Sequence, residues 1–94
     1  MLFVMIGRDG PNGATLRPAL RPAHLDHVRR FIADGHVHLA GPFTDGAGSM
    51  LLLEFDTLEE AQAMAAIDPY VTGGVFAEVK VHPFLRVFPE EATS

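Results

Sequence analysis

His24 occupies a position that an amphipathic helix normally gives to an apolar side chain. It lies in the segment RPAHLDHV, residues 21–28. At about 100° per residue, the helix predicted here has one apolar stripe, made of Leu25, Val28, Phe31 and Ile32. His24 falls inside that stripe, and His27 falls at its edge. Because imidazole exchanges a proton near neutral pH, His24 is the first candidate for chemistry.

Asp68 is the candidate partner of His24. It follows the apolar run of a second predicted helix, DTLEEAQAMAAI, and precedes a proline that ends this helix. A carboxylate beside a buried imidazole fixes its tautomer and leaves the other ring nitrogen free as a general base or acid. The distance between a helix start and a helix end is an objection to this pairing. In the alternative interpretation, His24 is a core residue satisfied by a carbonyl group and Asp68 is a turn residue.

Two further polar residues are candidates for substrate binding. Arg21 lies one turn before His24 and could bind a substrate carboxylate or phenolate, or remain a surface residue. Ser49 follows the turn DGAG at the start of an apolar run. Its hydroxyl could bind a ligand oxygen, although serine at this position is also ordinary turn chemistry.

Apolar residues and backbone complete the predicted pocket. Gly41 and Pro42 could form a pocket wall where the backbone approaches a ligand closely, or simply end a strand. Tyr70 and Phe43 fit a pocket lining and a hydrophobic core equally well. The sequence leaves these alternatives open.

His36 and His38 form an H-x-H pair on one face of a predicted strand. Such a pair offers two imidazole ligands to a transition metal. No third ligand follows at a recognisable spacing, so we expect no metal site. We likewise expect no cofactor.

Composition excludes several classes of function. The 94 residues carry a net charge of −5 and only seven lysines and arginines, with no basic run, which argues against nucleic acid and anionic membranes as partners. Cysteine is absent, so no thiol can act as a nucleophile or metal ligand. The N-terminal run LFVMI lacks the features of a signal peptide. We expect a single cytoplasmic domain, residues 1–94, without a membrane span.

The hydrophobic pattern predicts a four-stranded sheet. Residues 2–7 and 50–55 are continuously apolar, as in central strands, whereas residues 36–43 and 75–84 alternate, as in edge strands. Two helices separate these strands in the order βαββαβ. This order predicts a ferredoxin-like α+β fold, with both helices on one face of an antiparallel sheet.

The repeated RP dipeptide, with Pro18 and Pro22, places the start of the first helix between these prolines. Gly35 suits its C-terminal cap. Residues 8–15 are then expected to form a flexible loop. The helices leave the other face of the two apolar strands uncovered, which a chain of this length cannot cover by itself. We therefore expect a homodimer formed through the sheet faces.

The segments RPAHLDHV, HLAGPF and GSMLLLEFDTLEEAQAMAAIDPYVTGGVFAEVKVHPF resemble the YCII-related (YciI-like) family, over nearly the whole chain from Leu2 to about Phe88. The resemblance implies a dimeric α+β barrel built from ferredoxin-like subunits. It also implies an active-site histidine and aspartate, which fall on His24 and Asp68, and in at least one member a cofactor-free dehydrochlorinase of a chlorinated hydroxyquinol.

Together these features predict a small enzyme in which His24 and Asp68 act as a general acid/base pair on a small, cyclic or aromatic substrate. Elimination or isomerisation next to a carbonyl or phenol fits such a site. The alternative is a non-catalytic dimer that binds a small ligand or a protein partner. The sequence does not identify the substrate.

Overall fold

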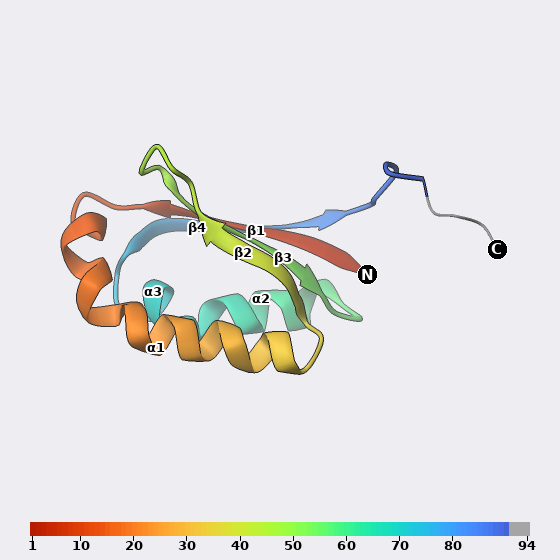
Figure 1. The fold of residues 1–94 in the computed structure, drawn as a ribbon, viewed down its shortest axis with the longest axis horizontal. Coiled ribbons are helices and arrows are strands. Elements are labelled where there is room, and N and C mark those ends of the chain that lie inside the picture. Colours follow the sequence, from red (N-terminus) through yellow and green to blue (C-terminus); the bar gives the residue numbers. More distant parts are fainter. Residues whose placement is uncertain (91–94) are drawn as a thin grey trace.

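The computed structural model describes residues 1–90. Its elements, in chain order, are β1 (Leu2–Asp9), α1 (Gly13–Ala33), β2 (Val37–Pro42), β3 (Gly48–Glu54), α2 (Leu58–Ala66), α3 (Pro69–Thr72) and β4 (Phe76–Phe84). The strands form one antiparallel sheet in the order β2-β3-β1-β4, and all helices lie on one face of it (Figure 1). The predicted ferredoxin-like α+β fold is confirmed, and the one-turn helix α3 is an addition to it.

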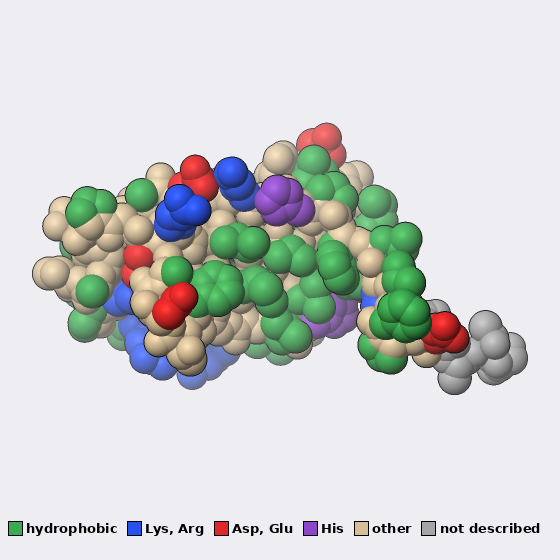
Figure 2. All heavy atoms as spheres, turned by 90° about the horizontal axis from the view of Figure 1, so that it is seen from above, with side chains coloured by type: hydrophobic (Ala, Val, Ile, Leu, Met, Phe, Trp, Pro, Cys, Tyr) green, Lys and Arg blue, Asp and Glu red, His purple; other side chains and the backbone are tan. Residues whose placement is uncertain are grey.

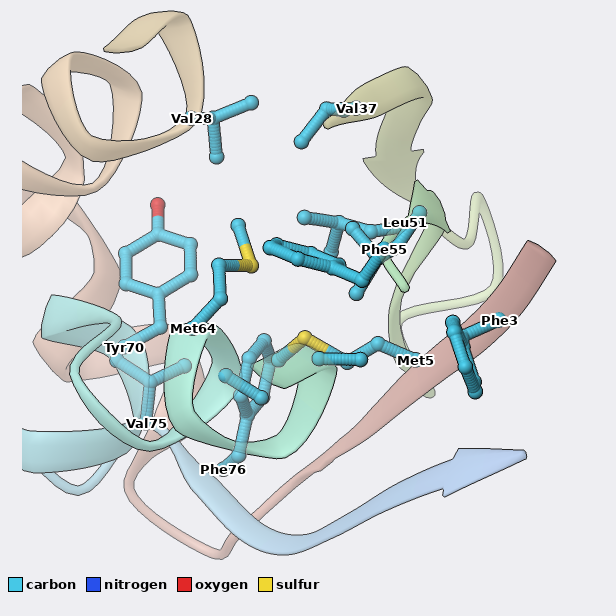
Figure 3. Close-up of a cluster of buried hydrophobic side chains, with 13 residues drawn as sticks. Phe3, Met5, Val28, Val37, Leu51, Phe55, Met64, Tyr70, Val75 and Phe76 are labelled. Atoms are coloured by element: carbon cyan, nitrogen blue, oxygen red, sulfur yellow. The ribbon is translucent and has the colours of Figure 1, made fainter. Parts of the chain in front are cut away.

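In the central strands β1 and β3, alternate side chains point toward the helices and are buried. Phe3 and Met5 of β1 and Leu51 and Leu53 of β3 are at most 1% exposed. Figure 3 shows this core, in which Met64 of α2 packs among the sheet residues. Burying side chains of this size stabilises the fold by about 1.5–3 kcal/mol each. The apolar runs therefore predicted the two central strands correctly.

The first helix begins earlier than the prolines suggested. Pro18 and Pro22 lie inside α1, which starts at Gly13, so the predicted flexible loop over residues 8–15 is wrong. Both prolines are exposed, so the carbonyl groups that lose a backbone partner face water. The first turns of α1 are inclined to the rest of the helix (Figure 1), as proline kinks predict.

Irregularities in both edge strands break the predicted alternation. In β2 the register shifts between Val37 and Leu39, so Val37 is 5% exposed whereas Leu39 is 51% exposed. A similar shift between Arg8 and Asp9 of β1 lets Phe76 of β4 enter the core. An extra residue in one strand reverses which side chains face the core. Simple alternation was therefore wrong for β2, whereas in β4 it fails only at Phe76 and Ala77 and is confirmed by Val79 and Val81, which pack against the core.

The second face of the sheet carries no helix. Its side chains come from alternate positions of the strands, including Leu2, Val4, Ile6, Leu39, Met50 and Leu52. They form an apolar band along the middle of the molecule (Figure 2). We call this band the outer sheet face. Among residues 1–90, no helix combines the length and apolar character needed to cross a membrane.

Candidate active site

His24 and Asp68 form a direct, buried hydrogen bond. His24 Nδ1 lies 2.7 Å from Asp68 Oδ1, and the two side chains are 11% and 0% exposed. Because an ionised carboxylate only accepts, Nδ1 carries the proton and donates it. The ring nitrogen left to accept a proton is then Nε2. The predicted pairing is present in the structure, and the alternative in which a carbonyl satisfies His24 is wrong.

The early start of α1 removes the objection that the two residues lie at distant helix ends. His24 sits in the middle of a 21-residue helix, opposite the point where the chain leaves α2. Asp68 is the N-cap of α3, and its Oδ1 also accepts a hydrogen bond from the backbone N–H of Tyr70 at 2.9 Å. Pro69 favours this helix start, because a residue in the first turn has no intrahelical acceptor for its N–H, so proline loses no hydrogen bond there. Local capping thus fixes the carboxylate that orients His24.

Tyr70 holds the imidazole ring from a second direction. Its ring stacks on His24 with centroids 3.8 Å apart and planes 6° from parallel, and it is 3% exposed. Figure 3 shows the Tyr70 side chain extending from α3 toward α1. The hydrogen bond to Asp68 and this stacking leave the imidazole little rotational freedom. Such restraint is the kind of preorganisation that acid–base catalysis requires.

A cavity of about 350 Å³ lies beside His24, between α1 and the β2–β3 half of the sheet. Its volume suits a small organic molecule. The predicted residues that line it are His24, Arg21, Gly41, Pro42, Ser49 and Tyr70. Its apolar wall includes Leu25, Val28, Ile32 and Leu51. The structure therefore brings the predicted binding residues together with His24.

Some lining residues differ in detail from their predicted roles. Gly41 contributes only backbone to the cavity wall, and a Cβ there would meet no atom of residues 1–90 within 4 Å, so packing within the chain does not require a glycine. Ile32, predicted within the buried stripe of α1, is 52% exposed at the cavity. Phe43 lies outside the residues that line the cavity and is 37% exposed. Ser49 lines the cavity and is 3% exposed, and its hydroxyl accepts a hydrogen bond from an arginine of α1, so it is not simply a turn residue.

Sequence reasoning missed Arg17, which also lines the cavity. Its Nε and Nη2 donate to Asp9 Oδ2 and Oδ1 at 2.9 and 2.7 Å, and Nη2 donates to Ser49 Oγ at 3.1 Å. The hydrogen bonds that Arg17 donates to the Asp9 carboxylate raise the pKa of Arg17 above its ordinary value. Its spacing from Arg21 and His24, four and seven residues, was a signal for one helix face. The misplaced helix start concealed that signal.

His27 lies next to the pair but differs from it in its partners. It is 6% exposed, and its Nε2 has no hydrogen-bond partner within residues 1–90. Burial lowers the pKa of His27, against a smaller opposing effect of the Asp68 carboxylate. Asp68 Oδ2 likewise has no partner in this part of the chain. His27 was predicted at the edge of the apolar stripe, and the structure buries it.

His36 and His38 both form hydrogen bonds with Glu54 of β3. His36 Nδ1 donates to the Glu54 carbonyl oxygen at 2.7 Å, and His38 Nε2 donates to Glu54 Oε1 at 3.0 Å. Glu54 also accepts from the N-terminal ammonium group at 2.7 Å. Within residues 1–90, no group of three or more histidine, aspartate or glutamate side chains is arranged to hold a metal ion.

The fold and the paired side chains define a ferredoxin-like α+β domain with a buried His–Asp pair beside a small cavity. Residues 1–85 match the YCII-related domain, and the chain belongs to this family. Protein YciI of Escherichia coli is 39% identical over 98 residues, covering 94% of this chain and all of that protein. An uncharacterised Haemophilus influenzae protein is 36% identical over 101 residues, with the same coverage.

Solved structures share the architecture. The 5-chloro-2-hydroxyhydroquinone dehydrochlorinase TftG of Burkholderia phenoliruptrix, in complex with 2,5-dihydroxybenzoquinone, superposes with a TM-score of 0.80 at 26% identity. The match covers 90% of this chain and 94% of TftG. Rv0793 of Mycobacterium tuberculosis shares the fold, with a TM-score of 0.54 at 16% identity and coverage of 98% and 97%.

Proposed function

We propose that this protein is a cofactor-independent enzyme in which His24, oriented by Asp68, transfers a proton on a small cyclic or aromatic oxygenated substrate. The 2.7 Å hydrogen bond between His24 Nδ1 and the fully buried Asp68 carboxylate carries this proposal. His24 also lines a cavity of suitable size. The reaction is of the lyase or isomerase type.

The geometry supports a two-step use of His24. Nε2 of the neutral ring accepts a proton from a substrate carbon next to a carbonyl group, and the electron pair of the broken C–H bond enters the enolate. The Asp68 carboxylate stabilises the imidazolium that forms. Nε2 then returns the proton to a different atom, which is isomerisation. Alternatively, the enolate expels a leaving group as an anion and the imidazolium supplies the proton, which is elimination.

The relationship to TftG supports a cyclic substrate. TftG is named as a dehydrochlorinase, and its structure contains a six-membered oxygenated ring compound. This chain resembles TftG over most of its length. The apolar side chains of Leu25, Val28 and Leu51 that line the cavity suit the apolar carbon skeleton of such a compound. The substrate of this chain is accordingly proposed as a small oxygenated ring.

An assay of turnover with and without His24 tests the proposal. 5-Chloro-2-hydroxyhydroquinone and a panel of cyclic hydroxyketones are screened for chloride release and for proton exchange with deuterated water. For any compound turned over, His24→Asn should lower kcat by about 100-fold or more, measured under conditions in which circular dichroism shows the variant to be folded. His38→Asn is the control, because His38 pairs with a carboxylate away from the cavity. Full turnover by the His24→Asn variant would refute the assignment.

A non-catalytic ligand-binding protein is the second candidate, and one observation favours it. Asp68 caps α3 through the Tyr70 N–H, so this carboxylate has a structural use apart from catalysis. In this case Asp68→Asn changes the stability of the protein, and ligand binding occurs without any conversion of the compounds in the panel. Observed turnover that depends on His24 would exclude this candidate.

The proposal includes a homodimer formed through the outer sheet face. The apolar band of this face, centred on Val4 and Leu52, is uncovered in the isolated chain (Figure 2), and exposed apolar areas of this kind favour association. Light scattering after size exclusion should give twice the mass of one chain, 10.2 kDa. Val4→Glu should produce monomers, whereas Gln62→Glu on the exposed side of α2 should not. A wild-type monomer at micromolar concentration would refute the dimer.

A further inference from the structure

The cavity beside His24 concentrates positive charge in an acidic protein. The chain has a net charge of −5, yet three of its seven lysine and arginine residues line this cavity, namely Arg17, Arg21 and Arg29. No aspartate or glutamate is among the lining residues. Walls of one charge sign and low polarity focus the field on the space between them. The charged side chains that line the cavity are therefore opposite in sign to the net charge of the whole protein.

Arg17 is held in a fixed orientation at this cavity. Asp9 binds it through two hydrogen bonds, and Ser49 binds the same Nη2 atom from β3. A Cβ at position 13 would lie 2.8 Å from Asp9 Oδ2, so Gly13 provides the space for this carboxylate. The arginine and aspartate side chains are only 22% and 13% exposed. A guanidinium held in this way loses little further entropy when it binds an anion.

Arg17 also adjoins the aromatic ring that packs on the candidate base. Its Cζ atom lies 4.9 Å from the centroid of the Tyr70 ring, and this ring stacks on His24 at 3.8 Å. A guanidinium group, a phenol ring and an imidazole ring are thus in successive contact along one side of the cavity. A ligand in contact with His24 is consequently close to a fixed cation.

Arg21 and Arg29 extend the positive charge to the exposed side of the cavity. Arg21 has no ion pair within residues 1–90, and Arg29 has only a loose contact of 3.6 Å with Asp26, in which both side chains are more than two-thirds exposed. The carboxylate of Asp9 offsets the charge of Arg17, but nothing comparable offsets Arg21. Arg21 is therefore a cation at the cavity wall without an internal ion pair among the described residues, whereas the Asp68 carboxylate lies behind His24, is fully buried and does not line the cavity.

We infer that the cavity selects a small planar anion, a carboxylate, enolate or phenolate, and that Arg17 and Arg21 bind its charged oxygen. The apolar ring of the ligand lies against Leu25, Val28 and Leu51, which leaves the carbon beside the charged group for His24. This inference rests on the proposed function in taking this cavity as the substrate site. It adds a charge requirement and names Arg17 as a residue that determines specificity.

Benzoate and benzamide test the charge requirement, because they share a ring and a similar shape but differ in charge. Their dissociation constants are measured by ¹⁵N–¹H NMR titration of the full chain. Benzoate should bind about tenfold or more tightly than benzamide, as expected for a charge-assisted pair. Arg17→Gln should weaken the binding of benzoate and not that of benzamide, so that the two dissociation constants become about equal. Arg21→Gln should reduce the preference for benzoate by a few-fold. Arg30→Gln, on the same helix but away from the cavity, should leave it unchanged.

Equal affinities in the wild-type protein, or no binding of benzoate, would overturn the inference. So would an unchanged preference in both the Arg17→Gln and Arg21→Gln variants. If Arg17→Gln fails to fold, Arg21→Gln alone decides, because Arg21 is exposed and makes no internal ion pair. The His24→Asn variant separates this inference from the proposed function: it should lose turnover and keep the preference for benzoate.

Discussion

Two histidine–carboxylate pairs in this molecule have similar bond lengths and different surroundings. His24 and Asp68 are 2.7 Å apart on the helix side of the sheet, with 11% and 0% exposure. His38 and Glu54 are 3.0 Å apart at the edge of the outer sheet face, with 45% and 42% exposure. Only the first pair is shielded from water and backed by a stacked ring. Both pairs adjoin a cavity, since His38 and Glu54 line one of about 830 Å³ at the edge of the outer sheet face. Burial and restraint, and not pairing alone, distinguish the candidate site.

The partners of the two carboxylates sharpen this contrast. Asp68 is bound by His24 and by a backbone N–H, and both bonds converge on one oxygen. Glu54 accepts hydrogen bonds from two exposed groups, the N-terminal ammonium and His38, and these lower its pKa, the ammonium more strongly. Water competes for both of its bonds. The Glu54 pair is therefore suited to holding the chain terminus and not to directing a proton.

Removing each carboxylate in turn should give the largest difference in stability between the two pairs. Asp68→Ala removes the α3 cap and leaves the buried His24 Nδ1 without its acceptor, so the free energy of unfolding should fall by about 3–5 kcal/mol. Glu54→Ala should give no measurable change, because its exposed pairs exchange with water. Urea denaturation of both variants provides the measurement. Equal losses in the two variants would show that burial does not set the pairs apart.

The stacked ring provides a second, smaller test. Tyr70→Leu should lower the free energy of unfolding by about 2 kcal/mol, because it removes the His24 stacking and leaves unfilled volume. It should also broaden the His24 ring resonances. Tyr70→Phe keeps the ring and should retain sharp resonances and most of the stability. Loss of the sharp His24 signals in the Tyr70→Phe variant would show that the hydroxyl group, and not the stacking, restrains the imidazole.

His27 should give the smallest effect, visible as a pH dependence. Since burial lowers its pKa in the folded state, the unfolded chain binds the proton more readily, and stability falls as pH drops below about 6.5 toward the folded pKa. Above the unfolded pKa this contribution is fully present. His27→Leu should flatten the stability profile in this window, with little loss at pH 8. Identical profiles for the wild-type protein and the variant would refute this role of His27.

The sequence predicted the sheet because the two central strands bury residues on a simple pattern. It failed where a backbone feature changes the pattern. Pro18 and Pro22 suggested a helix start, yet a helix tolerates both when the freed carbonyl groups face solvent. The bulges in the edge strands leave no mark in the order of apolar residues.

The same reasons govern what could be predicted of the candidate site. His24 stood out because it breaks an apolar stripe, and its assignment with Asp68 drew strength from the family resemblance. Arg17 did not stand out, because its partners Asp9 and Ser49 come from β1 and β3 and meet it only in the folded chain. Tyr70 was identified as lining, but its parallel stacking on His24 depends on the cap that begins α3.

The most direct test of the central claim is the tautomer of His24, read from its imidazole ¹⁵N chemical shifts in the wild-type protein and in Asp68→Asn. We predict a single tautomer at neutral pH, with the proton on Nδ1 and a free lone pair on Nε2. In Asp68→Asn this preference should be lost, while the signals of His38 stay unchanged. A wild-type His24 that is protonated on Nε2, or that keeps the same tautomer without the Asp68 carboxylate, would contradict it.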